Sequence, residues 1–130
     1  TLSSGGPLQL VALGPMVNEA LNAQKALERR GISAGVINAS TVKPLDTATL
    51  RRLHEQNMPY VVLEEQALMG GLGSAISEYC VQEGLRLPLR LFALPDRFIP
   101  QGSHDQLIKS LQLDGESIAE QIVHLQEMIA

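Results

Sequence analysis

The sequence predicts a three-layer α/β/α sandwich around a mostly parallel, about five-stranded sheet. Short apolar runs rich in β-branched residues alternate along the chain with longer segments whose apolar residues recur at helical spacing. Glycine or proline stands at most boundaries between these segments. Hydrophobic residues make up 45% of the 130 residues, which is enough to bury the core of one domain.

Four strands are expected, at residues 8–14, 33–39, 59–65 and 87–95. The first is a continuous apolar run, as in a strand buried on both faces, and the third has β-branched residues at its centre. A fifth strand is expected either around residues 101–103 or in the N-terminal tail, and the sequence does not choose between them.

Helices are expected between and after these strands, at residues 16–30, 46 or 47 to about 56, 72–83, 104–113 and 114–129. Pro15 suits the first turn of the first helix, and Gly31 suits the position just past its end. Gly84 ends the third helix in the same way. Because parallel strands are joined by crossover connections, we expect helices on both faces of the sheet.

The N-terminal tail, residues 1–7, is predicted to be a linker or cloning remnant that precedes one domain at 8–130. The tail begins "TLSSGG" and has no initial Met, so we expect the chain to be a piece of a larger protein. It also has no basic signal-peptide region, and no apolar run approaches the length of a membrane span. The single cysteine, Cys80, is expected to be a small apolar residue on a helix and fits a reducing compartment such as the cytoplasm.

Charge and composition argue against nucleic acid as a partner. The formal net charge is −4, only 3% of residues are aromatic, and no cluster of Lys and Arg exceeds a pair. Nucleic-acid binding therefore lacks its usual electrostatic footprint and its stacking platforms.

The glycine turn after the third strand raises the question of a nucleotide site, because ligands of such sheets bind where strands end. Gly71 and Gly73 match the first two glycines of G-x-G-x-x-G, but Ile76 stands in the third place and no Lys follows as in a P-loop. We therefore favour a structural role for Gly70, Gly71 and Gly73, which would permit positive φ and let the helix start pack close to neighbouring backbone. A weak anion site at the helix N-terminus and a contact with a partner chain remain alternatives.

The acidic residues beside this turn give no catalytic constellation. Glu64 and Glu65 are adjacent on a strand and point to opposite faces, so they are a poor acid/base pair. One is expected to cap the following helix or to pair across an interface, and the other to meet solvent. Asp96 and Arg97 are expected to form an ion pair that holds their loop. The three histidines lack metal-ligand spacing.

Four segments together resemble the C-terminal domain of transketolase-type enzymes: "VALGPMVNEAL", "GISAGVINASTVKPLD", "VVLEEQALMGGLGSAISEY" and "LPDRFIPQGSHDQLIKSLQLD". They occur in order from about residue 8 to the end of the chain. Among these enzymes they are most similar to 1-deoxy-D-xylulose-5-phosphate synthase. Transketolases and the beta subunits of pyruvate dehydrogenase share the layout more loosely.

The resemblance implies a role within a larger enzyme. Such a synthase condenses pyruvate with glyceraldehyde 3-phosphate and releases CO₂, in the first step of non-mevalonate isoprenoid synthesis. Its thiamine diphosphate and Mg²⁺ are held by two other domains, so the resemblance implies no catalytic, cofactor-binding or metal residue in this chain. It implies packing against those domains and support of a homodimer.

Candidates for structural or interface roles lie in the segments that carry the resemblance: Glu64, Glu65, Gln66, Gly70, Gly71, Gly73, Ser74 and Asp96. Ser40 and Gln66 depart from the residues that many relatives carry, which puts individual interdomain contacts in doubt. A different interpretation is a stand-alone regulatory or binding module that uses the same edge loops.

Overall fold

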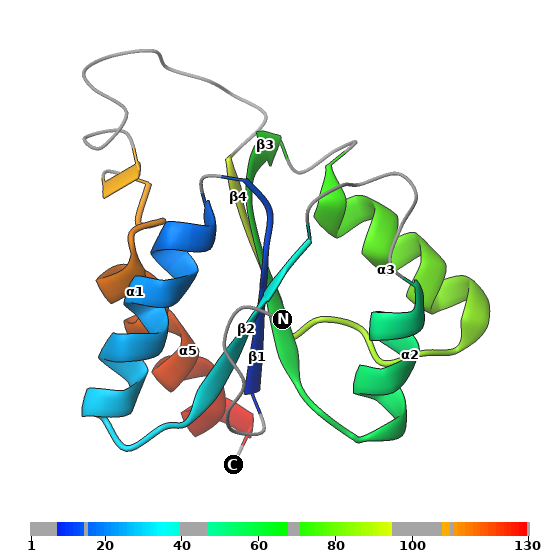
Figure 1. Cartoon of the computed structure of the whole chain (residues 1–130), viewed down its shortest axis with the longest axis horizontal. Coiled ribbons are helices and arrows are strands. Elements are labelled where there is room, and N and C mark those ends of the chain that lie inside the picture. The colour runs from blue at the N-terminus through cyan, green and yellow to red at the C-terminus, as the bar shows by residue number, and fades with distance from the viewer. Residues whose placement is uncertain are drawn as a thin grey trace.

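The computed structural model describes residues 8–14, 16–39, 47–67, 71–94, 108–109 and 111–129. Its centre is a parallel sheet of β1 (Leu8–Ala12), β2 (Ala34–Asn38), β3 (Tyr60–Ala67) and β4 (Arg90–Leu94), in the order β2-β1-β3-β4. Helices cover both faces (Figure 1). The three-layer α/β/α prediction is therefore confirmed.

The number of strands differs slightly from the prediction. The described residues form a four-stranded sheet, against the expected total of about five. Both places suggested for a fifth strand, the N-terminal tail and residues 101–103, lie outside the described residues.

The described helices match four of the five predicted segments. The first two are α1 (Met16–Arg29) and α2 (Thr47–Glu55), and the others are α3 (Leu72–Glu83) and α5 (Gly115–Ile129). In the remaining segment, 104–113, residues 108–109 are helical and residues 111–113 are not, and the other residues lie outside the described part of the structure. Gly31 and Gly84 follow α1 and α3 with φ of 78° and 68°, the left-handed backbone that ends a helix. None of the described helices is both long and apolar enough to cross a membrane.

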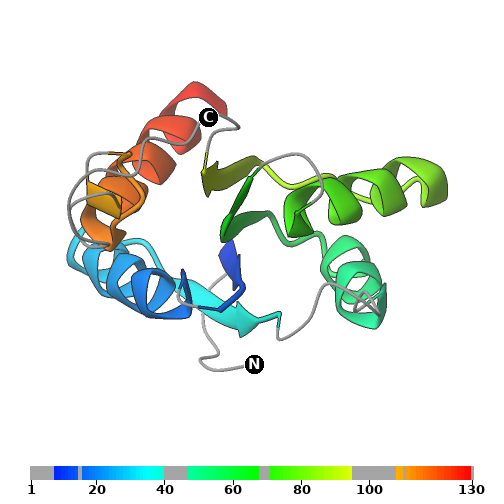
Figure 2. The same ribbon diagram turned by 90° about the horizontal axis from the view of Figure 1, so that it is seen from above.

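The sheet separates two apolar cores, because alternate residues of each strand point to opposite faces. On one face, α1 and α5 pack over Leu10, Val61 and Phe92. On the other face, α2 and α3 pack over Val11 and Val62. Figure 2 shows the pairs α1/α5 and α2/α3 on opposite sides of the sheet.

The carboxyl end of β3 departs from regular pairing with β4. Leu63 is paired with Phe92, and the next recorded partners are Ala67 and Leu94. β3 thus contains more residues than β4 over this interval, which is the property of a bulge. The irregularity falls at the acidic residues Glu64 and Glu65.

Candidate functional site

Glu64 is the central described residue at the carboxyl edge of the sheet. Its side chain is buried although it is acidic, with a relative exposure of 1%. A buried carboxyl group needs hydrogen-bond donors in place of water. The backbone N–H of Gly73, in the first turn of α3, donates a hydrogen bond to Oε2 of Glu64. Glu64 therefore caps the helix that follows its strand, one of the alternatives that the sequence left open.

The N-terminus of α3 receives this acceptor from outside the helix. The residue that precedes the helix, Gly71, has no side chain, and no side-chain cap is made at that position. The first N–H groups of a helix have no partners within it, and its dipole favours negative charge there. Glu64 supplies both an acceptor and an acidic group at the place where a bound phosphate would otherwise lie.

Gly73 has close neighbours at the place where a side chain would begin. A Cβ atom added there would lie 3.0 Å from Cδ1 of Leu91 and 3.1 Å from Oε2 of Glu64. The predicted close approach to neighbouring backbone is therefore wrong for Gly73, whose closest neighbours are the side chains of Leu91 and Glu64.

The positive φ expected in the glycine cluster is wrong for both described glycines. Gly71 has φ −93° and ψ −170°, an extended conformation that other residues also adopt. Gly73 lies within α3, and positive φ is recorded at Gly14, Gly31 and Gly84 instead. The cluster begins a helix rather than forming a left-handed turn at these two positions.

The structure describes only some of the other predicted site residues. Ser74 is half-buried in the first turn of α3, close in sequence to Gly73. The backbones of Glu65 and Gln66 belong to β3, and their side chains are outside the described part of the structure. Gly70, Asp96 and Arg97 lie outside the described residues, so the interface roles and the Asp96–Arg97 pair stay predictions.

Sequence reasoning missed a polar cluster at the opposite, amino edge of the sheet. The Tyr60 hydroxyl donates to the carbonyl O of Arg86 over 2.9 Å, and its Oη lies 3.5 Å from Sγ of Cys80. The Arg86 N–H donates to Nδ1 of His54 over 3.0 Å, and its guanidinium donates to Oδ1 of Asn57. These residues come from three separate segments, so no local pattern could reveal the cluster.

The cluster ties the α3–β4 connection to the end of α2 and is best explained by structure. Burial raises the pKa of Tyr60 well above its ordinary value, and the hydrogen bond with Cys80 raises it further. Tyr60 thus stays protonated and keeps donating to Arg86. Cys80 is buried, as expected for an apolar core residue.

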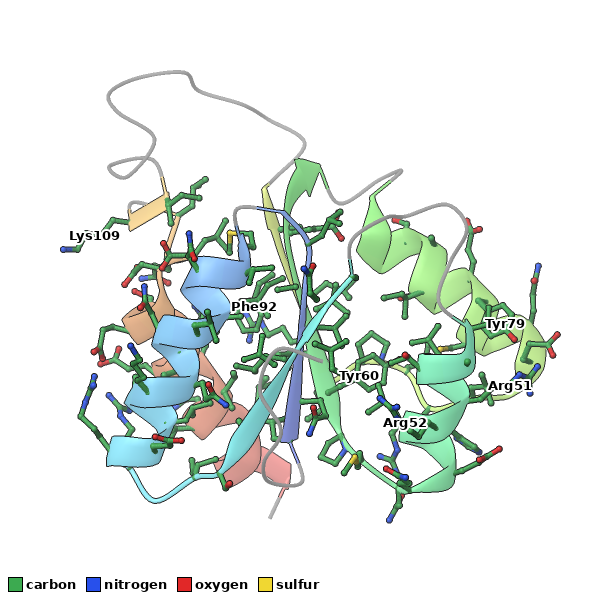
Figure 3. All side chains as sticks on the ribbon, viewed as in Figure 1. Arg51, Arg52, Tyr60, Tyr79, Phe92 and Lys109 are labelled. Carbon is green, nitrogen blue, oxygen red and sulfur yellow. The ribbon has the colours of Figure 1, made fainter. Side chains whose placement is uncertain are left out.

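A second missed contact joins α2 to α3. Nε of Arg51 donates to the Tyr79 hydroxyl over 3.1 Å, and Nη2 donates to Oε1 of Glu83 over 2.7 Å. The guanidinium also lies 5.7 Å from the centre of the Tyr79 ring, and Figure 3 shows the two side chains meeting between the helices. All three groups are partly exposed, so this contact orients α3 more than it stabilises the fold.

The described residues do not fit a thiamine diphosphate and Mg²⁺ site. No three His, Cys, Asp or Glu side chains within the described part of the chain are close enough to hold a metal ion. At the glycine turn, the Gly73 N–H that a phosphate oxygen would use is already bonded to Glu64. A diphosphate would also meet the acidic side chain of Glu64 there.

The chain matches a known family model. The model for the transketolase C-terminal domain matches residues 1–118, which is most of the chain. The chain belongs to the transketolase C-terminal domain family. This confirms the family recognised from the four sequence segments.

Two curated relatives of this transketolase C-terminal domain carry the same name. The chain is 41% identical to 1-deoxy-D-xylulose-5-phosphate synthase of Rippkaea orientalis over 124 residues, 95% of the chain and 20% of the relative. It is 40% identical to the enzyme of the same name from Chlorobium luteolum over 117 residues, 90% of the chain and 18% of the relative. The chain thus spans about a fifth of the length of these relatives.

Solved structures agree on the fold. A split gene transketolase, described as an inactive beta4 tetramer, superposes with a TM-score of 0.75 and 29% identity, over 96% of this chain and 40% of that one. A transketolase from Pichia stipitis, in complex with sedoheptulose-7-phosphate, has a TM-score of 0.61 and 21% identity, over 92% of this chain and 16% of that one. The second likeness supports the fold alone.

Proposed function

We propose that the chain is the C-terminal domain of a 1-deoxy-D-xylulose-5-phosphate synthase. The complete enzyme would be a cytoplasmic transferase that joins pyruvate to glyceraldehyde 3-phosphate with loss of CO₂. The observation that carries this proposal is the name shared by relatives that are 37–41% identical over 90% or more of the chain.

The domain's own contribution is packing rather than catalysis. At the carboxyl edge, buried Glu64 accepts a hydrogen bond from the start of α3, which favours a structural role for this edge. Thiamine diphosphate and Mg²⁺ would be held by the other domains, and no reaction step is assigned to residues of this chain. The domain itself would begin at residue 8, after a linker at 1–7.

The partners are the remaining domains of the same enzyme, and the complete enzyme would be a homodimer. The relatives are about five times as long as this chain, so most of the enzyme would lie outside it. The related split gene transketolase is a beta4 tetramer, and this self-assembly of a similar chain supports an oligomer. Neither nucleic acid nor a membrane is part of the proposal.

A transketolase is the second candidate. The chain is 29% identical to the split gene transketolase and superposes on it well, so the same domain could serve an enzyme that transfers a different group. Reading the gene upstream of Thr1 separates both enzyme proposals from a stand-alone module. An upstream Gly-Asp-Gly motif, the family's thiamine diphosphate signature, supports an enzyme, whereas a start codon close to Thr1 supports the module.

Activity of the encoded full-length protein then tests the reaction. We expect CO₂ release from pyruvate that depends on glyceraldehyde 3-phosphate, thiamine diphosphate and Mg²⁺. Transfer of a two-carbon unit between sugar phosphates without CO₂ release would favour the transketolase instead.

A further inference from the structure

The surface of α3 that faces away from the sheet carries an exposed apolar side chain. Ser77, Glu78, Val81 and Gln82 line a shallow hollow there, which we call the α3 outer face. The Val81 side chain is 69% exposed, and Leu87, in the following connection, is 49% exposed. Among the described residues these two are the exposed large hydrophobic side chains. Figure 2 shows α3 extending away from the sheet.

The inner side of α3 does not explain this exposure. Ile76 and Cys80 are buried in the core beneath the helix, and Tyr79 is engaged with Arg51. Val81 follows them on a different side of the helix. Val81 leaves apolar area in water there, and covering that area with another apolar surface is favourable.

Other helices present charged residues to solvent. Across α1 and α5, exposed ion pairs join Arg29 to Glu116 and Arg30 to Glu120. On α2, the exposed residues include Arg52 and Glu55, which carry charge into water. These surfaces are typical of helices that face solvent. The α3 outer face carries a single charged residue, Glu78, within its hollow.

We propose that the α3 outer face is the surface through which this domain packs against the preceding domains of the longer enzyme. The inference rests on the proposed function, in which about four-fifths of the polypeptide lies outside this domain. Val81 enters an apolar depression of the neighbouring domain, and Glu78 accepts a hydrogen bond or an ion pair from a basic side chain beside it.

A second copy of this domain fits the same face less well. Two-fold symmetry places the same patch on both partners. It would therefore bring two Glu78 carboxylates toward each other in an interface with low water content, where like charges repel strongly. A different surface with a basic group avoids this repulsion, which favours the preceding domains as the partner.

Thiol labelling measures whether this face is covered. The matching fifth of the Rippkaea orientalis synthase is replaced by this chain, which gives a chimera to compare with the isolated chain. Val81→Cys places a thiol on the α3 outer face, and Lys25→Cys places one on exposed α1 as the matched control. Maleimide labelling of each site is followed by mass spectrometry of its peptide, and buried Cys80 is quantified as background.

We expect labelling at position 81 to be at least about tenfold slower in the chimera than in the isolated chain. Labelling at position 25 should change by less than about twofold. The inference would be overturned if position 81 were labelled at the same rate in the chimera and in the isolated chain. It would also be overturned if labelling were slowed equally at positions 81 and 25. Turnover by the chimera with the native domain is measured separately. An active chimera with an unprotected position 81 refutes the inference alone, and an inactive chimera with a protected position 81 counts against the proposed function alone.

Discussion

Gly115 begins α5 at the point where this helix lies against α1. A Cβ atom at this position would lie 2.7 Å from the backbone N of Ala23 and 2.8 Å from the carbonyl C of Asn22, and closer still to Cβ of Asn22. Two of these three atoms belong to the backbone of α1, which cannot rotate away as a flexible side chain can. The Gly115 N–H also donates to Oε1 of Glu19 over 2.9 Å. Gly115→Ala must therefore move the helices apart.

The cost can be estimated from overpacking. An extra methyl group in a tight contact costs about 1–3 kcal/mol, and alanine recovers about 0.5–1 kcal/mol of glycine's backbone entropy. Because two of the three overlapping atoms belong to the backbone, the upper end of the overpacking range applies, and a net loss of about 2 kcal/mol remains. An unfolding entropy of about 2.1 cal/mol/K per residue gives roughly 0.27 kcal/mol/K for this length, so Tm should fall by about 7 °C. Thermal melts followed by circular dichroism measure this shift.

Two further variants separate steric overlap from other effects. At Gly31, where φ is 78°, an added Cβ atom would meet open space. Gly31→Ala should therefore cost only the backbone strain of about 1–2 kcal/mol. Adding Asn22→Gly to Gly115→Ala removes the side-chain contact and leaves both backbone contacts, so stability should not return. A Gly115→Ala melt within about 2 °C of the native protein, or full rescue by Asn22→Gly, would refute the close backbone approach.

Two predictions concern buried polar groups. Glu64→Ala leaves the Gly73 N–H without its acceptor and should lower the free energy of unfolding by about 1–3 kcal/mol in urea titrations. Glu64→Gln keeps an acceptor and should lose less, and equal losses would contradict the cap. Because the pKa of Tyr60 is raised in the folded state, its contribution to stability is complete below pH of about 10 and is lost as pH rises further. In Tyr79→Phe, where Tyr60 is the remaining tyrosine, ionisation followed at 295 nm should coincide with unfolding. Ionisation of Tyr60 near pH 10 while the protein is still folded would show that its pKa is not raised.

Regular elements could be predicted because their signals are local. The 72–83 helix matches α3 at both ends, since a glycine turn precedes it and Gly84 follows it. The first strand was predicted two residues too long, because Leu13 and Gly14 continue the apolar run but lead into the turn before α1. The third strand was predicted to end at residue 65 and ends two residues later, at Ala67, because Ala67 pairs with Leu94 of β4 beyond a bulge that the sequence does not reveal.

The candidate site was harder to predict because it depends on contacts between separate segments. Acidic residues are rarely buried, so the sequence alone did not show whether the Glu64 side chain meets solvent, pairs across an interface or caps the following helix. The donor at Gly73 becomes apparent only when α3 is placed beside the end of β3. The Tyr60–Arg86 cluster is of the same kind, since its hydrogen bonds join residues that are 20 to 32 positions apart.

Glu64 also argues against the anion-site alternative for the glycine turn, in the part that the structure describes. Anion binding at a helix start needs N–H groups that face solvent and no acidic residue nearby. Here Gly73 is buried, its N–H is bonded to Glu64, and Leu91 closes the space where a side chain or ligand atom would lie. A phosphate at this N–H would have to displace a buried carboxyl group from its hydrogen bond, which is unfavourable. The absence of a side chain at Gly73 thus serves the approach of Glu64 and Leu91 to α3, and the glycine turn fixes the helix that carries the α3 outer face.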